Sequence, residues 1–258
     1  MATGKRRALS HVGGEVALVG APGAMRDALL FALDVDERQE ATLAHVHGFH
    51  SYPARLHPHT AARLVEALSK PRDTVLDPFV GSGTVLVEAR RLGRRALGVD
   101  SNPLAVALAS LKTRGISPEE AEELVLAARA VAEHAEGPRP SCAGPTKRYP
   151  PEDRELYDVH VLLELDGLKD GISELGAGTR LAAAEARRML ELVLSALLTK
   201  VSKKAADTSE HRENRRLRAG FTITLFVKKT EELSRRMLDY SRLLPERAPP
   251  RGPPGGAA

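Results

Sequence analysis

Between His45 and about Gly115, apolar and polar residues alternate in blocks that favour helices and strands following one another at short spacing. A short apolar run at 74–77 ends in Asp-Pro-Phe and a glycine-rich turn. The next ten residues, 84–93, place Val85, Leu86, Ala89 and Leu92 on one helical face before Gly93. A second apolar run, 94–100, ends at Asp100. This order predicts a buried strand, a turn, a helix and a parallel strand, as in an α/β open sheet.

From Ser117 onward the pattern becomes mostly helical. Ser117 fits an N-cap, Pro118 the first turn, Glu120 a capping box and Gly137 the end of the first long helix. Residues 187–203 repeat apolar positions at helical spacing. The stretch "FTITLFV" at 221–227 alternates like a strand but also fits the start of a helix, and both interpretations stay open.

Four regions follow from these patterns. Residues 1–40 form an N-terminal segment of mixed character, and residues 41–115 form the α/β core. Residues 116–245 form a helical insert that is a candidate target-recognition region. The Pro- and Gly-rich tail at 246–258 cannot bury an apolar face and is predicted to be disordered.

Composition limits the function only broadly. The 258 residues are 42% hydrophobic and 28% charged, which suits a globular protein, and no apolar run is long enough for a membrane helix. With Cys142 as the single cysteine, an internal disulfide is excluded, and a cytoplasmic location is expected. A net charge of +4 favours a polyanionic partner only weakly.

The turn at 77–84 has the chemistry of a nucleoside site. Gly81 and Gly83 allow the backbone to approach a ligand, and Asp100 follows the next strand, where a carboxylate accepts from ribose hydroxyls. A dinucleotide fingerprint would need Gly or Ala at the position of Leu86. Asp77 would repel a pyrophosphate but attract a cationic amine. The pattern therefore favours an adenosine-type cofactor that carries positive charge.

"DPFVGSGT" and "GVDSNP" together resemble the first two cofactor motifs of class I methyltransferases. The Asp-Pro-Phe-x-Gly-Ser-Gly-Thr form is typical of amino-methylating DNA methyltransferases, which act on cytosine N4 or adenine N6, and of some RNA guanine methyltransferases. The resemblance implies a Rossmann-like core, a parallel sheet with flanking helices, and S-adenosyl-L-methionine as cofactor. The matching cofactor-binding positions are Asp77, Pro78, Phe79, Gly81, Ser82, Gly83, Thr84, Asp100 and Asn102.

Upstream, "FHSYPARLHPHTAARLVEAL" resembles the segment that closes over the methionine end of the cofactor in the same enzymes, which adds Tyr52 and Pro53 to the expected site. His45 and His47 also form a His-x-His pair of the kind found in some metal-dependent hydrolases. The longer ligand set of those hydrolases is missing, so we predict no metal site.

The resembled enzymes hold the target amine with a tetrapeptide of Asp, Asn or Ser, two prolines and an aromatic residue. No Pro-Pro pair in this sequence is followed by an aromatic residue, so the catalytic residues are unassigned. One explanation is a shortened or split enzyme whose second chain carries the motif; the other is a different acceptor. Asp158, Glu164 and Asp166 are the first acidic candidates if the chain is complete.

The polar stretch after residue 200 resembles the loop between insert and catalytic segment in related methylases. Its basic residues are candidate phosphate contacts: Lys203, Lys204, Arg212, Arg215 and Arg216. We therefore expect a DNA amino-methyltransferase with DNA as partner and no membrane partner. An RNA guanine or adenine methyltransferase and a non-catalytic cofactor-binding or nucleic-acid-binding subunit are the alternatives.

Overall fold

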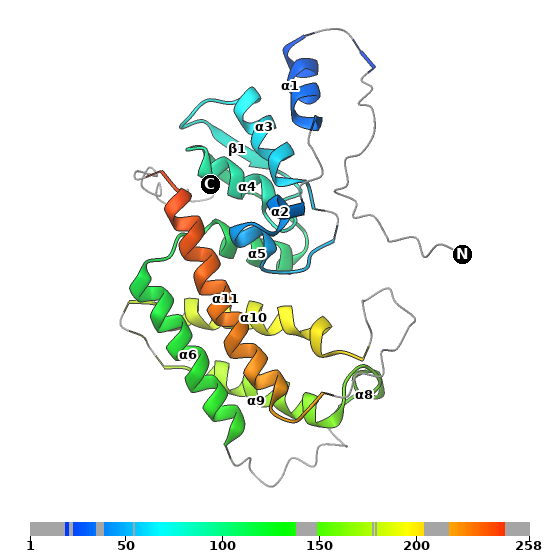
Figure 1. Ribbon diagram of the computed structural model, residues 1–258, viewed down its shortest axis with the longest axis vertical. Coiled ribbons are helices and arrows are strands. Elements are labelled where there is room, and N and C mark those ends of the chain that lie inside the picture. The colour runs from blue at the N-terminus through cyan, green and yellow to red at the C-terminus, as the bar shows by residue number, and fades with distance from the viewer. Residues whose placement is uncertain are drawn as a thin grey trace, which may run out of the picture. The chain divides into compact units, whose positions relative to one another are not determined.

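The computed structural model describes residues 19–20, 23–34, 39–53, 55–137, 149–176, 178, 180–203 and 217–245. These residues are mostly helical, with one small sheet (Figure 1). They separate into two compact units: residues 116–238 form one, and those up to Gly115 together with those from Asp239 form the other.

The first unit holds both strands. Its elements are α1 (Ala24–Leu33), α2 (Gln39–Leu43), the 3₁₀ helix η1 (His45–Gly48), α3 (Pro58–Leu68), β1 (Thr74–Asp77), α4 (Thr84–Arg91), β2 (Arg95–Gly98) and α5 (Pro103–Thr113). The predicted order of strand, turn, helix and parallel strand is confirmed: β1 pairs with β2 in parallel, with Leu76 opposite Leu97.

One face of the sheet is covered by helix α4. Val80, Leu86 and Ala109 form a buried apolar cluster against which Ala96 of β2 packs. Gly98, on the same face of β2, leaves room for this packing, since a Cβ there would lie 2.6 Å from Val80 Cγ2 and 2.7 Å from Leu86 Cδ1. The helix therefore lies closer to the sheet than any residue larger than glycine allows.

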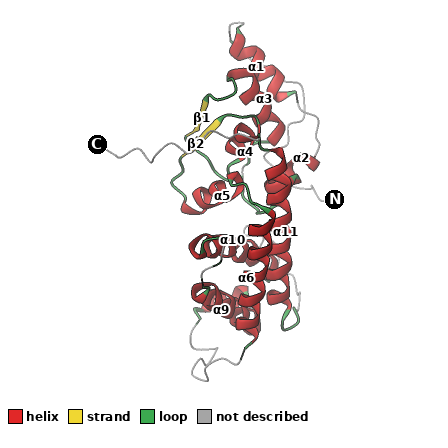
Figure 2. Cartoon of the chain, turned by 90° about the vertical axis from the view of Figure 1, so that its left-hand side faces the viewer, coloured by secondary structure: helices red, strands yellow, loops and turns green. Residues whose placement is uncertain are grey.

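The other face of the sheet is bare, which corrects the prediction of a buried strand. Leu76 is 61% exposed, Leu97 58% and Val99 61%. Parallel sheets are normally covered on both faces, so an apolar face of this kind is unusual. Two strands are all that the described residues contribute (Figure 2). The α/β class is thus borne out as a two-stranded parallel fragment, and the described residues do not form a full sheet with helices on both sides.

The second unit is entirely helical in its described part. It contains α6 (Pro118–Glu136), α8 (Pro151–Leu156), α9 (Val159–Glu174), α10 (Ala183–Val201) and most of α11 (Phe221–Leu243). The predicted cap of the first helix is confirmed, because Ser117 and Glu120 form the capping box and Gly137 is the C-cap. The stretch 221–227 is helical. Of the helices described, none combines the length and apolar character that crossing a lipid bilayer requires.

The last turn of α11 belongs to the first unit. Tyr240 is fully buried there, and its hydroxyl donates to the Val87 carbonyl of α4 at 3.2 Å. Its ring lies 5.5 Å from that of His45. This turn thus completes the core on the side of α4 that faces η1.

Candidate functional site

The glycine turn connects β1 to α4 and is closed by backbone hydrogen bonds. Val80 N donates to Val99 O at 3.0 Å, and Gly83 N donates to Val80 O at 2.8 Å. Gly81 has φ +48° and Gly83 has φ +85°, a left-handed conformation that side chains beyond glycine rarely adopt. The sequence therefore needs glycine at both positions to make the turn.

The two glycines have different surroundings. A Cβ at Gly83 would lie 2.8 Å from Ala109 Cα, so this glycine is needed for the close approach of the turn to α5. A Cβ at Gly81 would make only ordinary contact, 3.6 Å from the Tyr52 ring. A Cβ at Gly83 would thus meet the protein's own helix α5, and the approach of a ligand to the backbone of the two glycines stays a prediction.

Asp100 follows β2 and is joined to the turn. Its Oδ2 accepts from Gly81 N at 2.8 Å, and its Oδ1 accepts from Asn102 N at 2.9 Å. The hydrogen bonds from the Asn102 and Gly81 backbone lower the pKa of this carboxyl below its usual value. The carboxylate is therefore held ionised and in a fixed orientation, and each oxygen keeps a lone pair for a further donor.

Tyr52 lies beside the same turn. Asn102 Nδ2 lies 3.4 Å from its hydroxyl, and Asn102 Oδ1 caps α5 by accepting from Leu104 N at 3.0 Å. The structure thus brings Tyr52, Gly81, Asp100 and Asn102 together from three separate stretches of sequence.

The remaining predicted positions surround the turn. Asp77 Oδ1 accepts from Phe79 N at 3.0 Å, and the Phe79 side chain is 86% exposed. Pro53 and Pro78 are exposed, whereas Thr84, the first residue of α4, is buried. The Ser82 hydroxyl is buried and has no hydrogen-bond partner among the described residues. A buried hydroxyl without a partner is unusual, and it fits a site that supplies one with its ligand.

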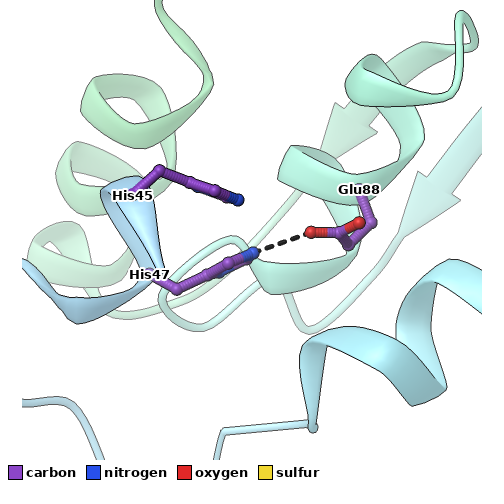
Figure 3. A group of neighbouring side chains, drawn as sticks. All are labelled: His45, His47 and Glu88. Carbon is purple, nitrogen blue, oxygen red and sulfur yellow. Dashed lines mark hydrogen bonds and ion pairs between the residues drawn. The ribbon is translucent and has the colours of Figure 1, made fainter. Parts of the chain in front are cut away.

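A polar cluster of His45, His47 and Glu88 lies where η1 meets α4, with His47 and Glu88 buried and His45 half-buried (Figure 3). His47 Nε2 and Glu88 Oε1 are 2.8 Å apart, and Arg91 Nε donates to the other Glu88 oxygen at 2.8 Å. The centroids of the His45 and His47 rings are 4.8 Å apart and the rings are tilted by 45° to each other. The candidate ligand atoms of His45, His47 and Glu88 lie within 4.8 Å of one another.

The charges around this cluster favour an internal hydrogen-bond network over a metal site. Burial lowers the pKa of His47 and outweighs the opposing effect of Glu88. Burial alone would raise the pKa of Glu88, but its bonds to His47 and Arg91 lower it. A neutral His47 therefore donates to an ionised Glu88. Lys112 and Arg55 both lower the pKa of His47, and the positive charge of Arg55 also opposes a divalent cation.

The predicted nucleic-acid contacts are only partly covered by the structure. Lys203 bonds within the helical unit, where its Nζ pairs with Asp158 Oδ1 at 3.0 Å and its N–H donates to Leu156 O at 2.8 Å. The other four basic positions, Lys204, Arg212, Arg215 and Arg216, lie outside the described residues.

The three acidic residues considered for catalysis have separate surroundings. Asp158 makes the ion pair with Lys203. Glu164 is buried and accepts from Gly220 N at 2.6 Å and Thr222 N at 2.9 Å, which caps the start of α11. Asp166 lines a cavity. No local sequence pattern indicates the Glu164 cap, because its partners are more than fifty residues away.

Residues 33–110 match the model of the DNA methylase family of N6/N4 type. The type II methyltransferase M.MjaII of Methanocaldococcus jannaschii is 30% identical over 95 residues, 37% of this chain and 18% of that protein. M.MvaI of Kocuria varians is 36% identical over 77 residues, 29% of this chain and 17% of its own length. M2.LlaDCHI of Lactococcus lactis subsp. cremoris is 46% identical over 50 residues, 19% of each chain. No solved structure gives a significant match.

The matched segment runs from the end of α1 through β2 and most of α5, so it contains the whole glycine turn, Tyr52 and Asp100. The chain spans less than a fifth of the length of each of these relatives. The segment that holds the glycine turn is therefore similar to the corresponding segment of amino-methylating DNA methyltransferases.

Proposed function

We propose that this protein takes part in S-adenosyl-L-methionine-dependent methylation of exocyclic amino groups in DNA, with residues 41–115 as its cofactor-binding core. The observation that carries the proposal is the bond between Gly81 and Asp100, which joins the two cofactor motifs at the end of a parallel sheet. The match to DNA methylases over residues 33–110 supports the choice of DNA as substrate.

The charges and hydrogen-bonding groups around the glycine turn match those of this cofactor. Asp100 offers an ionised carboxylate for two ribose hydroxyls, and Asp77 offers negative charge near a cationic amine. Ser82 has a buried hydroxyl able to donate or accept, and Tyr52 offers a ring face beside Gly81. When bound, the cofactor supplies an activated methyl group on a sulfonium. The residues of the turn bind and orient it, and we assign no proton transfer to them.

We further propose that a second polypeptide supplies the group that holds the target amine. Holding an amine in line with the methyl is worth a factor on the order of a thousand or more in rate, and the sequence lacks the Pro-Pro-aromatic tetrapeptide. The exposed apolar face of β1 and β2 supports this proposal, because parallel strands are normally covered on both faces.

Residues 116–245 are proposed to contact DNA. The basic positions proposed for these contacts are Lys203, Lys204, Arg212, Arg215 and Arg216.

A methyl-transfer assay tests the proposal. Radiolabelled cofactor is incubated with unmethylated mixed-sequence DNA or with RNA, first with the isolated chain and then with the polypeptide encoded directly downstream. We expect weak transfer by the chain alone and transfer to DNA with the second polypeptide. Robust turnover by the chain alone would contradict the two-chain proposal, and labelling of RNA but not DNA would contradict the choice of substrate.

A further inference from the structure

One lysine of the first unit is almost completely buried. Lys112 lies in the last turn of α5 and is only 1% exposed. Burial, and after it the like charge of Arg55, lower the pKa of Lys112 from 10.5 to about 7. Near neutral pH this side chain therefore changes between an ammonium and a neutral amine inside the fold.

The polar groups around Lys112 do not balance an added positive charge. Both oxygens of Glu88 are already bonded, one to His47 and the other to Arg91, at 2.8 Å in each case. In the described part of the chain, the charged and titratable groups of the surrounding elements are Arg55 of the loop before α3, His45 and His47 of η1, Glu88, Arg90 and Arg91 of α4, and Tyr240 of α11. Protonation of Lys112 therefore places a second positive charge near Arg55, and buried charge without a partner is costly.

Arg55 is connected to the candidate cofactor site by a short piece of chain. Its Nη1 donates to His47 O at 2.7 Å, which fixes it to η1. Tyr52, three residues earlier, lies beside the glycine turn, and its hydroxyl is 3.4 Å from Nδ2 of Asn102, the N-cap of α5. Helix α5 thus acts on this stretch near both of its ends, through Asn102 and through Lys112. A displacement of Arg55 should also move Tyr52, because only two residues separate them.

We propose that Lys112 is a proton-sensitive positioning residue for the cofactor: its neutral amine keeps Arg55 and Tyr52 in the binding arrangement, and its ammonium displaces them. The identity of the ligand rests on the proposed function, whereas the coupling of Lys112 to Tyr52 does not. By linkage, cofactor binding favours the neutral amine and releases the proton that Lys112 carries. The affinity for the cofactor should therefore fall below about pH 7, with the fraction of Lys112 that is neutral.

An NMR titration of the full chain without cofactor tests the coupling. The tyrosine rings are labelled with ¹³C, and Tyr52→Phe identifies the Tyr52 signal among the four tyrosines. This signal should shift with a midpoint near pH 7, and the shift should be absent in Lys112→Met, which removes the amine and keeps an apolar chain of similar length. Lys112→Leu replaces it if the methionine variant fails to fold. Lys70→Met, at an exposed position, is the matched control and should keep the shift.

Calorimetry with S-adenosylhomocysteine measures the effect on the cofactor site. Titrations at about pH 7 in phosphate and in Tris give the number of protons released, because the two buffers differ in their heat of ionisation, and the parent chain should release about half a proton more than Lys112→Met. From about pH 8 to about pH 6, its Kd should rise about five- to tenfold more than the Kd of Lys112→Met. The comparison of the two proteins cancels protons that belong to the ligand or to Asp100.

The two measurements separate this proposal from the proposed function. Equal proton release and equal pH dependence in the parent chain and Lys112→Met would overturn the proposal, as would a Tyr52 signal that titrates alike in both. Binding of S-adenosylhomocysteine without any effect of Lys112 would contradict the coupling and leave the proposed function standing. A shift of Tyr52 that depends on Lys112, in a chain that binds no S-adenosylhomocysteine, would support the coupling and contradict the proposed function.

Discussion

The backbone N–H of Gly81 and the carboxylate of Asp100 lie 2.8 Å apart, and this bond joins the turn after β1 to the residue that follows β2. The bond fixes the position of one motif relative to the other, because Asp100 is also held by the N–H of Asn102. A change that displaces either strand should therefore affect both motifs at once. The packing of α4 on the sheet makes this expectation testable.

Gly98→Ala should destabilise the first unit and weaken cofactor binding. The added Cβ would lie 2.6 Å from Val80 Cγ2 and 2.9 Å from Val80 Cβ, so the buried start of the glycine turn would have to shift. Overpacking of this kind costs about 1–3 kcal/mol, which urea denaturation measures. Gly23→Ala is the control, because a Cβ at Gly23 meets nothing within 4 Å. Equal midpoints for the two variants would show that α4 does not need this close packing.

The sequence predicted local elements well and their surroundings poorly. The capping box of Ser117 and Glu120 lies within one helical turn, so its residues identify it without the fold. The stretch 221–227 could not be assigned in the same way, because its apolar residues fit both the two-residue repeat of a strand and the repeat of a helix. It is the start of helix α11, and this start is capped by the distant residue Glu164. The prediction that β1 is buried was wrong. An apolar run shows that a strand is able to pack against a partner, but it does not show that the partner is present, and nothing in the described chain covers Leu76.

At the candidate site the motif residues are recognisable in the sequence, but the contact that each of them makes within the fold is not. The glycines and Asp100 are recognisable from their spacing in the sequence. Gly83 makes room for Ala109 of α5, and Gly98 makes room for Leu86 of α4. These contacts depend on how closely the two helices pack, and no local sequence pattern predicts that distance.

Glu164→Ala should lower stability without changing cofactor binding. Glu164 satisfies the N–H groups of Gly220 and Thr222 at the start of α11, where helix donors lack internal partners. Loss of a buried cap costs about 1–3 kcal/mol. Asp170→Ala, at an exposed position of the same helix α9, should leave the unfolding midpoint nearly unchanged. A stable Glu164→Ala protein that has lost methyl transfer would instead support a catalytic role.

Lys112→Met should change the pH dependence of stability. Burial, with a further effect of Arg55, lowers the pKa of Lys112 from 10.5 to about 7. Between pH 7 and 9 the unfolded chain keeps a proton that the folded chain loses, so the free energy of unfolding should rise with pH by about 1 kcal/mol per unit. Denaturation of the parent chain should show this rise, and Lys112→Met should lack it. Lys70→Met, at an exposed position, should keep it. The same pH slope in parent and Lys112→Met would contradict the assignment.

The His45, His47 and Glu88 cluster should hold no stoichiometric metal. His47 donates to Glu88, Arg91 donates to the second carboxylate oxygen, and Arg55 adds positive charge nearby. Elemental analysis of protein purified without chelators should find well under one zinc per chain. One tightly bound zinc that His47→Ala removes would reverse this conclusion.

Calorimetric titration with S-adenosyl-L-methionine tests the central claim most directly. The parent chain should bind one equivalent, and Asp100→Ala should bind at least about tenfold more weakly, because charge-assisted hydrogen bonds to the ribose are lost. Glu66→Ala, an exposed change on α3, should bind like the parent. Asp100→Ala binding as tightly as the parent, or a parent chain that prefers NAD to S-adenosyl-L-methionine, would contradict the claim that this turn is a methyltransferase cofactor site.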